Sequence, residues 1–89
     1  MRIVICNMIS EISGAYRILD LDTGMALDKQ GQWYHKKDIW IDTNSFWNVC
    51  WVVRKDAENF FKEWLKTLPK EQADEVFASY IAEKLVGNR

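Results

Sequence analysis

The chain has 89 residues, of which 48% are hydrophobic and 28% are charged, and 12 basic and 13 acidic side chains give a formal net charge of -1. This composition is typical of a single soluble globular domain and excludes a disordered chain. Because the charges are nearly balanced and evenly spread, they exclude a global attraction to nucleic acids or to membranes.

The first predicted element is a strand over residues 2–9. Its apolar side chains alternate onto both faces, with Ile3 and Ile5 on one face and Val4 and Met8 on the other. A strand of this kind is expected to be covered from both sides, which predicts a central position in a sheet. The apolar run is too short to span a bilayer, and no small-residue cleavage site follows it.

Glycine and polar residues then divide the first half of the chain into short segments. We expect strands over residues 15–21, 25–28, 32–35 and 39–42, with turns near Gly14, Gly24 and Gly31. Strands joined by tight turns pair antiparallel, so a β-meander is the simplest topology.

Residues 46–53 form the next predicted strand. Their β-branched and aromatic content favours a strand over a helix, and this run is the second candidate for a central strand. Alternation would place Trp47 and Trp51 on one face and Cys50 on the other. Trp47 and Trp51 could then fill the core beneath the helices, as large rings usually do.

The hydrophobic period changes to that of helices in the second half. We predict one amphipathic helix over about residues 57–68, capped by Asp56, and a second over about 70–86 that ends near Gly87. Trp64 lies on the apolar side of the first helix and is expected in the core. The fold class is therefore α+β, in which a meander of four to five strands (about 2–54) precedes two helices packed on one face of the sheet, all in one domain over residues 1–89.

Cys6 and Cys50 are the only cysteines, and both lie in apolar segments. We expect reduced, buried thiols, as in a cytoplasmic protein, rather than a secreted disulfide scaffold. The sequence leaves open whether the two thiols are close in space.

The chain shows no convincing catalytic, metal-binding or cofactor-binding pattern. Residues 20–23 read Asp-Leu-Asp-Thr and resemble the aspartate loop of haloacid-dehalogenase-type phosphatases over those few residues. That resemblance implies that Asp20 is a phosphoryl nucleophile in a doubly wound domain, which 89 residues are too few to form. Gly24 makes a hairpin turn the better interpretation.

His35 is the sole histidine, so no histidine pair is available to a transition metal.

Tryptophan is the most informative residue type here, because four of the five tryptophans fall within residues 33–51. A short domain cannot bury every large ring, and an exposed indole is a common anchor of protein interfaces. The predicted protein-binding surface consists of Trp33, Tyr34, Trp40 and Trp47.

We therefore expect a small non-enzymatic module that binds another protein, as an accessory subunit, adaptor or inhibitor. Its size also suits inhibitors encoded by phages and mobile elements. One alternative is a single-stranded nucleic-acid-binding protein that uses Trp33, Tyr34, His35, Lys36 and Lys37, although nucleic acid is the less expected partner. A structural homodimer that pairs through an edge strand is the other alternative.

Overall fold

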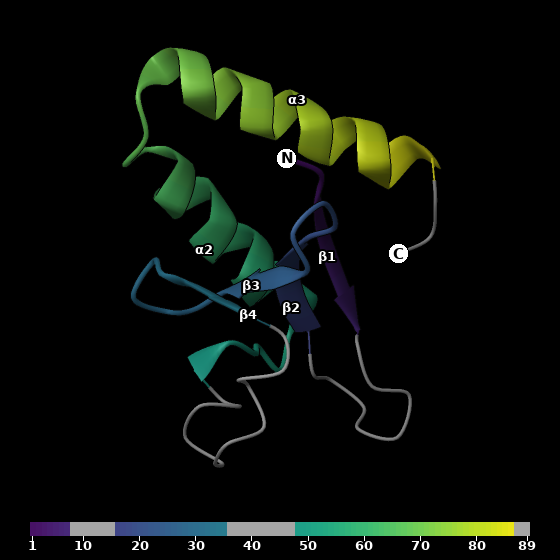
Figure 1. The fold of residues 1–89 in the computed structure, drawn as a ribbon. Helices are drawn as coiled ribbons and strands as arrows, with labels where there is room; N and C mark the ends of the chain where they lie inside the picture. Colours follow the sequence, from purple (N-terminus) through teal and green to yellow (C-terminus); the bar gives the residue numbers. More distant parts are fainter. Residues whose placement is uncertain (8–15, 36–47, 87–89) are drawn as a thin grey trace.

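A computed structural model describes residues 1–7, 16–35 and 48–86 (Figure 1). Its strands are β1 (Ile3–Asn7), β2 (Tyr16–Asp20), β3 (Met25–Leu27) and β4 (Trp33–His35), and its helices are α2 (Arg54–Leu65) and α3 (Lys70–Val86). In space, α3 packs against β1, while α2 packs against β1 and β2. This arrangement confirms the predicted α+β class.

The four strands form one antiparallel sheet in the order β1-β2-β3-β4, which is the predicted meander. The predicted turns near Gly24 and Gly31 are present, and that near Gly14 lies outside the described residues. Gly24 and Gly31 have φ angles of 73° and 83°, a region that residues with a side chain rarely adopt. The strand predicted over residues 39–42 lies outside the described residues.

The turn between β2 and β3 is held by Asp20, which is only 4% exposed. Its carboxylate accepts hydrogen bonds from the amide of Asp22 at 3.0 Å and from the hydroxyl of Thr23 at 3.1 Å. It also accepts one from the amide of Arg2 at 3.1 Å. Short polar side chains stabilise turns in this way, so the expected hairpin turn is present and Asp20 has a structural role in it.

Two apolar clusters lie on opposite faces of the sheet. The larger cluster fills the space between the sheet and the two helices and contains, among others, Ile3, Ile5, Ile18, Leu27, Phe61 and Tyr80. The smaller cluster covers the other face and contains Val4, Leu19, Ala26, Val49 and Cys50. Alternation along β1 explains this division, since Ile3 and Ile5 point to the helices and Val4 points away from them.

The predicted central position of β1 is wrong within the described sheet, because β1 is the first strand in the order. Its burial on both faces was predicted correctly: Ile3, Val4 and Ile5 are all at most 5% exposed. The helices cover one face and the smaller cluster covers the other, so a strand at the end of the described order can be buried as fully as a central one.

The strand predicted over residues 46–53 is also wrong for its described part, residues 48–53. Only Trp51 makes a β-bridge there, exchanging two backbone hydrogen bonds of 2.8 Å with Tyr16. Val49, Cys50 and Trp51 are buried consecutively instead of alternating, and Val52 is 65% exposed. The apolar run reflects a buried connection, whose tertiary contacts outweigh β propensity.

Both predicted helices are present. The range of α3 agrees with the predicted 70–86, while α2 begins and ends three residues before the predicted 57–68. The predicted cap at Asp56 is wrong, since Val53 occupies the N-cap without a side-chain hydrogen bond. Asp56 lies instead in the first turn, where a carboxylate is favoured by the helix dipole.

Candidate functional site

The aromatic strand surface is only partly exposed. Trp33 is half-buried and packs edge-on against Trp64, with ring centroids 5.6 Å apart. Such a pair is a favoured aromatic arrangement and fixes the indole at the margin of the larger cluster. Trp33 is therefore half-buried instead of fully exposed, and its predicted role in protein binding stays a prediction.

Tyr34 is 44% exposed, so its predicted place at the surface is correct. It pairs with Ala26 of β3, a member of the smaller cluster, and so lies on the opposite face of the sheet from the helices. His35 is also exposed. The other predicted contact residues, Trp40, Trp47, Lys36 and Lys37, lie outside the described residues.

Trp51 is 8% exposed and belongs to the larger cluster, where its ring lies 5.2 Å from that of Phe60. The expected core role of Trp51 is confirmed. Trp64 is half-buried and packs against the same cluster, as expected from its place on the apolar side of α2.

The most exposed apolar surface that the structure describes lies on α3. One side of this helix buries Val76 and Tyr80 against the rest of the molecule. Six other apolar residues are exposed, and we call them the apolar side of α3: Phe77, Ala78, Ile81, Ala82, Leu85 and Val86. Phe77 and Ile81 are 39% and 37% exposed, whereas Leu85 and Val86 in the last turn are 82% and 79% exposed.

The spacing of these residues explains why one helix carries two apolar sides. Residues i, i+4 and i+8 follow one another along a helix surface, so Phe77, Ile81 and Leu85 form a continuous row. At 100° per residue, Val76 and Leu85 point in nearly opposite directions. Burial of Val76 against the sheet therefore leaves Leu85 pointing outward.

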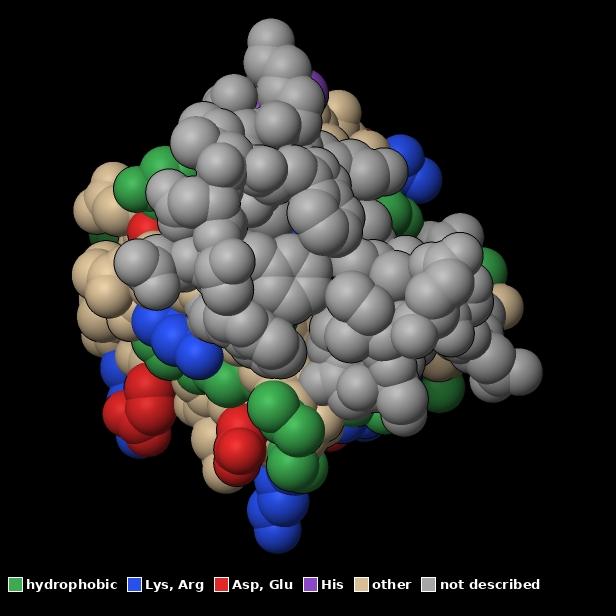
Figure 2. All heavy atoms as spheres, turned by 90° about the horizontal axis from the view of Figure 1, so that it is seen from below, with side chains coloured by type: hydrophobic (Ala, Val, Ile, Leu, Met, Phe, Trp, Pro, Cys, Tyr) green, Lys and Arg blue, Asp and Glu red, His purple; other side chains and the backbone are tan. Residues whose placement is uncertain are grey.

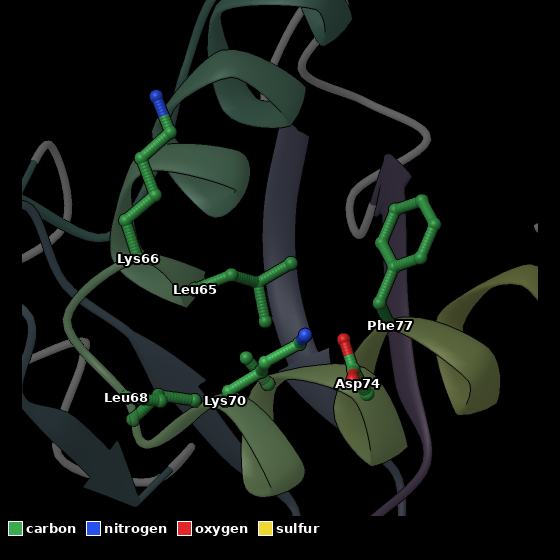
Figure 3. Close-up of a pocket in the computed structure, with 7 residues that line it drawn as sticks. Leu65, Lys66, Leu68, Lys70, Asp74 and Phe77 are labelled. Atoms are coloured by element: carbon green, nitrogen blue, oxygen red, sulfur yellow. The ribbon is translucent and has the colours of Figure 1, made fainter.

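A shallow groove of about 410 Å³ continues this surface at the junction of α2 and α3. Its apolar lining comes from Leu65, Leu68, Ala73 and Phe77, and its charged lining from Lys66, Lys70 and Asp74. Figure 3 shows Leu65 reaching from α2 toward α3, which supplies Lys70, Asp74 and Phe77. Because Phe77 belongs to both, the groove and the apolar side of α3 form one surface.

The two helices are tied together by a small polar network. Glu58 of α2 accepts a long hydrogen bond of 3.5 Å from the Tyr80 hydroxyl and lies 3.8 Å from the Lys84 ammonium. Burial raises the pKa of the Tyr80 phenol, and the negative charge of Glu58 adds to this effect. The network links α2 to the side of α3 that carries the buried Tyr80.

Arg17 lies between Cys6 and Cys50 beside the smaller cluster. Arg17 is 1% exposed, and its Nε donates a hydrogen bond of 3.2 Å to the Cys50 sulfur. Cys6 is the register partner of Arg17 on β1 and packs against the same cluster. Neither cysteine is in a disulfide, and Cys6 is less deeply buried than Cys50.

Other kinds of site find no support in the described parts of the chain. Over residues 1–7, 16–35 and 48–86, no group of three histidine, cysteine or acidic side chains could hold a metal ion. Neither α2 nor α3, the two helices described, is long and apolar enough to cross a membrane. On the face shown in Figure 2, the visible basic and acidic side chains are intermixed and do not form a patch of one sign.

The apolar side of α3 was not predicted from the sequence as a surface. In the sequence, the helical spacing of apolar residues predicts the second amphipathic helix with a single apolar side, made of Ala73, Val76, Phe77, Tyr80, Ile81 and Leu85. Comparison with known proteins gives no further guidance: no family model, no curated protein and no solved structure matches the chain.

Proposed function

We propose that this chain is a small non-enzymatic protein-binding module, which acts as an accessory subunit, adaptor or inhibitor of a larger protein. The observation that supports the proposal is the apolar side of α3, with Leu85 and Val86 about four-fifths exposed. Contact with a partner would remove this area from water, which is the main favourable term in most protein association. The groove beside Phe77 offers a recess for one anchoring side chain of the partner.

Tyr34 remains a candidate for a second contact. It lies on the opposite face of the sheet from the helices, so it does not belong to the same flat interface as α3. The predicted contacts at Trp40 and Trp47 stay predictions. A separate Tyr34→Ala variant distinguishes a contact on this face from one on α3.

The test is affinity capture from a lysate with the wild-type chain and with Leu85→Glu. A carboxylate at an exposed position leaves the fold intact but is costly to bury in an apolar interface. Val52→Glu is the matched control, since Val52 is 65% exposed and lies outside both helices. We expect wild type and Val52→Glu to retain the same protein and Leu85→Glu to lose it.

Reconstitution of the captured protein with the purified chain then establishes direct binding. Equal capture by Leu85→Glu and wild type would remove α3 from the proposal. Self-association through the same side of α3 is the competing proposal, and it predicts a molecular mass that rises with protein concentration in wild type but not in Leu85→Glu.

A further inference from the structure

The first two turns of α3 carry exposed carboxylates next to the apolar side. We call Glu71, Asp74 and Glu75 the acidic end of α3; all three are exposed. Among the described residues, none of the three has an ion pair within 4.0 Å. Lys70 is the one basic residue in these two turns. Lys66 also lines the groove, but its ammonium is paired with Glu63 at 3.0 Å, so the first two turns of α3 carry an excess of negative charge.

Helix stability alone accounts for only part of this acidic end. A carboxylate in the first turn is favoured by the helix dipole, and this explains Glu71. The dipole effect falls off within the first turn, whereas Asp74 and Glu75 lie in the second turn. Asp74 also lines the groove that adjoins Phe77. Asp74 therefore borders the surface that we assign to binding, and Glu75 lies three residues before Ala78, so the two are neighbours on the helix surface.

We infer that the occupant of this surface is an amphipathic helix of another protein, apolar on one side and carrying lysine or arginine where it meets the acidic end. This inference rests on the proposed function and names its class of partner. From Phe77 to Val86 the apolar side extends about 14 Å along α3, which corresponds to about two and a half turns of a facing helix. Ala78 and Ala82 are small, so the two helices can approach closely, with Phe77, Ile81 and Leu85 packing alongside.

Charge argues against two other occupants. A second copy in parallel alignment would place two acidic ends together. In antiparallel alignment, the last turn of the facing α3 offers only Lys84, which already lies 3.8 Å from Glu58. An anionic lipid surface would repel the acidic end. An amphipathic helix with basic residues can pack on the apolar side of α3 and pair its lysines or arginines with the carboxylates of the acidic end.

The experiment uses two synthetic helical peptides of about 14 residues with the same leucine stripe, one with lysine and one with glutamate at its polar positions. Binding to the full chain is measured by calorimetry or by fluorescence anisotropy. We expect the lysine peptide to bind at least about tenfold more tightly at low salt, since three exposed carboxylates contribute modestly each. Added salt should reduce this difference because exposed charges are screened.

Matched variants separate the charges from the fold. Asp74→Asn should weaken the binding of the lysine peptide several-fold. The triple change Glu71→Gln, Asp74→Asn and Glu75→Gln should remove most of the difference in affinity between the two peptides. Asp56→Asn is the control, because Asp56 is an exposed carboxylate at the start of α2, away from the α2–α3 junction. This control should bind both peptides as wild type does.

The outcomes distinguish this inference from the proposed function. If both peptides bind equally and Leu85→Glu abolishes both, the apolar side binds proteins but the basic partner is wrong. If neither peptide binds, or if the triple variant keeps the full preference, the inference is overturned. It is also overturned if the wild-type chain dimerises through α3 or sediments with anionic phospholipid vesicles.

Discussion

Asp28 shows how a single buried carboxylate organises a segment without regular secondary structure. It is 1% exposed, and one oxygen accepts hydrogen bonds from the amides of Gln30 and Gln32 at 2.9 and 2.7 Å. Its other oxygen accepts a hydrogen bond of 3.3 Å from the side-chain amide of Asn48. The β3–β4 turn and the buried connection before α2 are thereby held to each other.

Replacement of Asp28 should therefore be costly. Asp28→Ala leaves two backbone amides and one side-chain amide without their acceptor, and we expect a loss of about 3 kcal/mol in the free energy of unfolding. Chemical denaturation measures this loss. Asp74→Ala is the control, since it removes an exposed carboxylate and should change stability by less than about 0.5 kcal/mol. Equal losses in the two variants would contradict the role given to Asp28.

The raised pKa of Tyr80 predicts how the stability of the molecule changes at alkaline pH. Burial raises the pKa of its phenol above the unfolded value of about 10, so the folded state holds the proton more tightly. Tyr80 therefore contributes to the free energy of unfolding. This contribution is fully present below pH 10, and it is lost as the pH rises through the pKa that Tyr80 has in the folded state. We expect Tyr80→Phe to lose stability less steeply above pH 10 than wild type, as measured by denaturation at several pH values. Parallel curves for the two proteins would contradict this prediction.

At the scale of elements, agreement between sequence and structure depends on whether local chemistry decides the element. The turns at Gly24 and Gly31 require φ angles that glycine adopts readily, so β2, β3 and β4 were predicted to within a residue or two. Residues 48–53 have no such local constraint. Trp51 pairs with the backbone of Tyr16 and Asn48 donates to Asp28, both far away in the chain, and no local pattern encodes those contacts.

The surface of α3 was missed for a related reason. An apolar residue in a helix indicates a contact without saying whether that contact is internal. The angular spread from Val76 to Leu85 is the signal that could have revealed it, because one face of a helix cannot bury residues that point in opposite directions. On the strands, Trp33 was expected outside because its neighbours are polar, yet α2 supplies Trp64 as its packing partner.

Two valines of α3 test its two sides with the same substitution. Val76 is 5% exposed and Val86 is 79% exposed. Val76→Ala removes buried methyl groups and should cost about 2 kcal/mol in the free energy of unfolding. Val86→Ala should be neutral or slightly stabilising, because alanine has the higher helix propensity. Thermal or chemical unfolding measures both, and a comparable loss for Val86→Ala would show that the outer side of α3 supports the fold.

At the scale of the whole molecule, the sheet separates two surfaces with different roles. The helix side carries the larger cluster, and the proposed binding surface lies on the outer side of α3. The other face holds the smaller cluster, the buried Arg17 and both thiols. Changes at Leu85 or Asp74 should therefore leave the environment of Cys50 unaltered, so that binding variants can be checked for intact folding by the protection of this thiol.

The arrangement of the thiols leads to a redox prediction. β2 lies between Cys6 on β1 and Cys50, which adjoins the bridge from Tyr16 to Trp51. Two strand spacings place their Cα atoms about 10 Å apart, beyond the roughly 7 Å that a disulfide tolerates. Under mild oxidation we expect no intramolecular disulfide, and we expect a thiol reagent to label the half-buried Cys6 before the fully buried Cys50. Mass spectrometry of labelled peptides measures both, with Cys6→Ser as the control that should leave Cys50 protected until unfolding. A disulfide formed in the folded protein would show that β2 does not separate the two thiols.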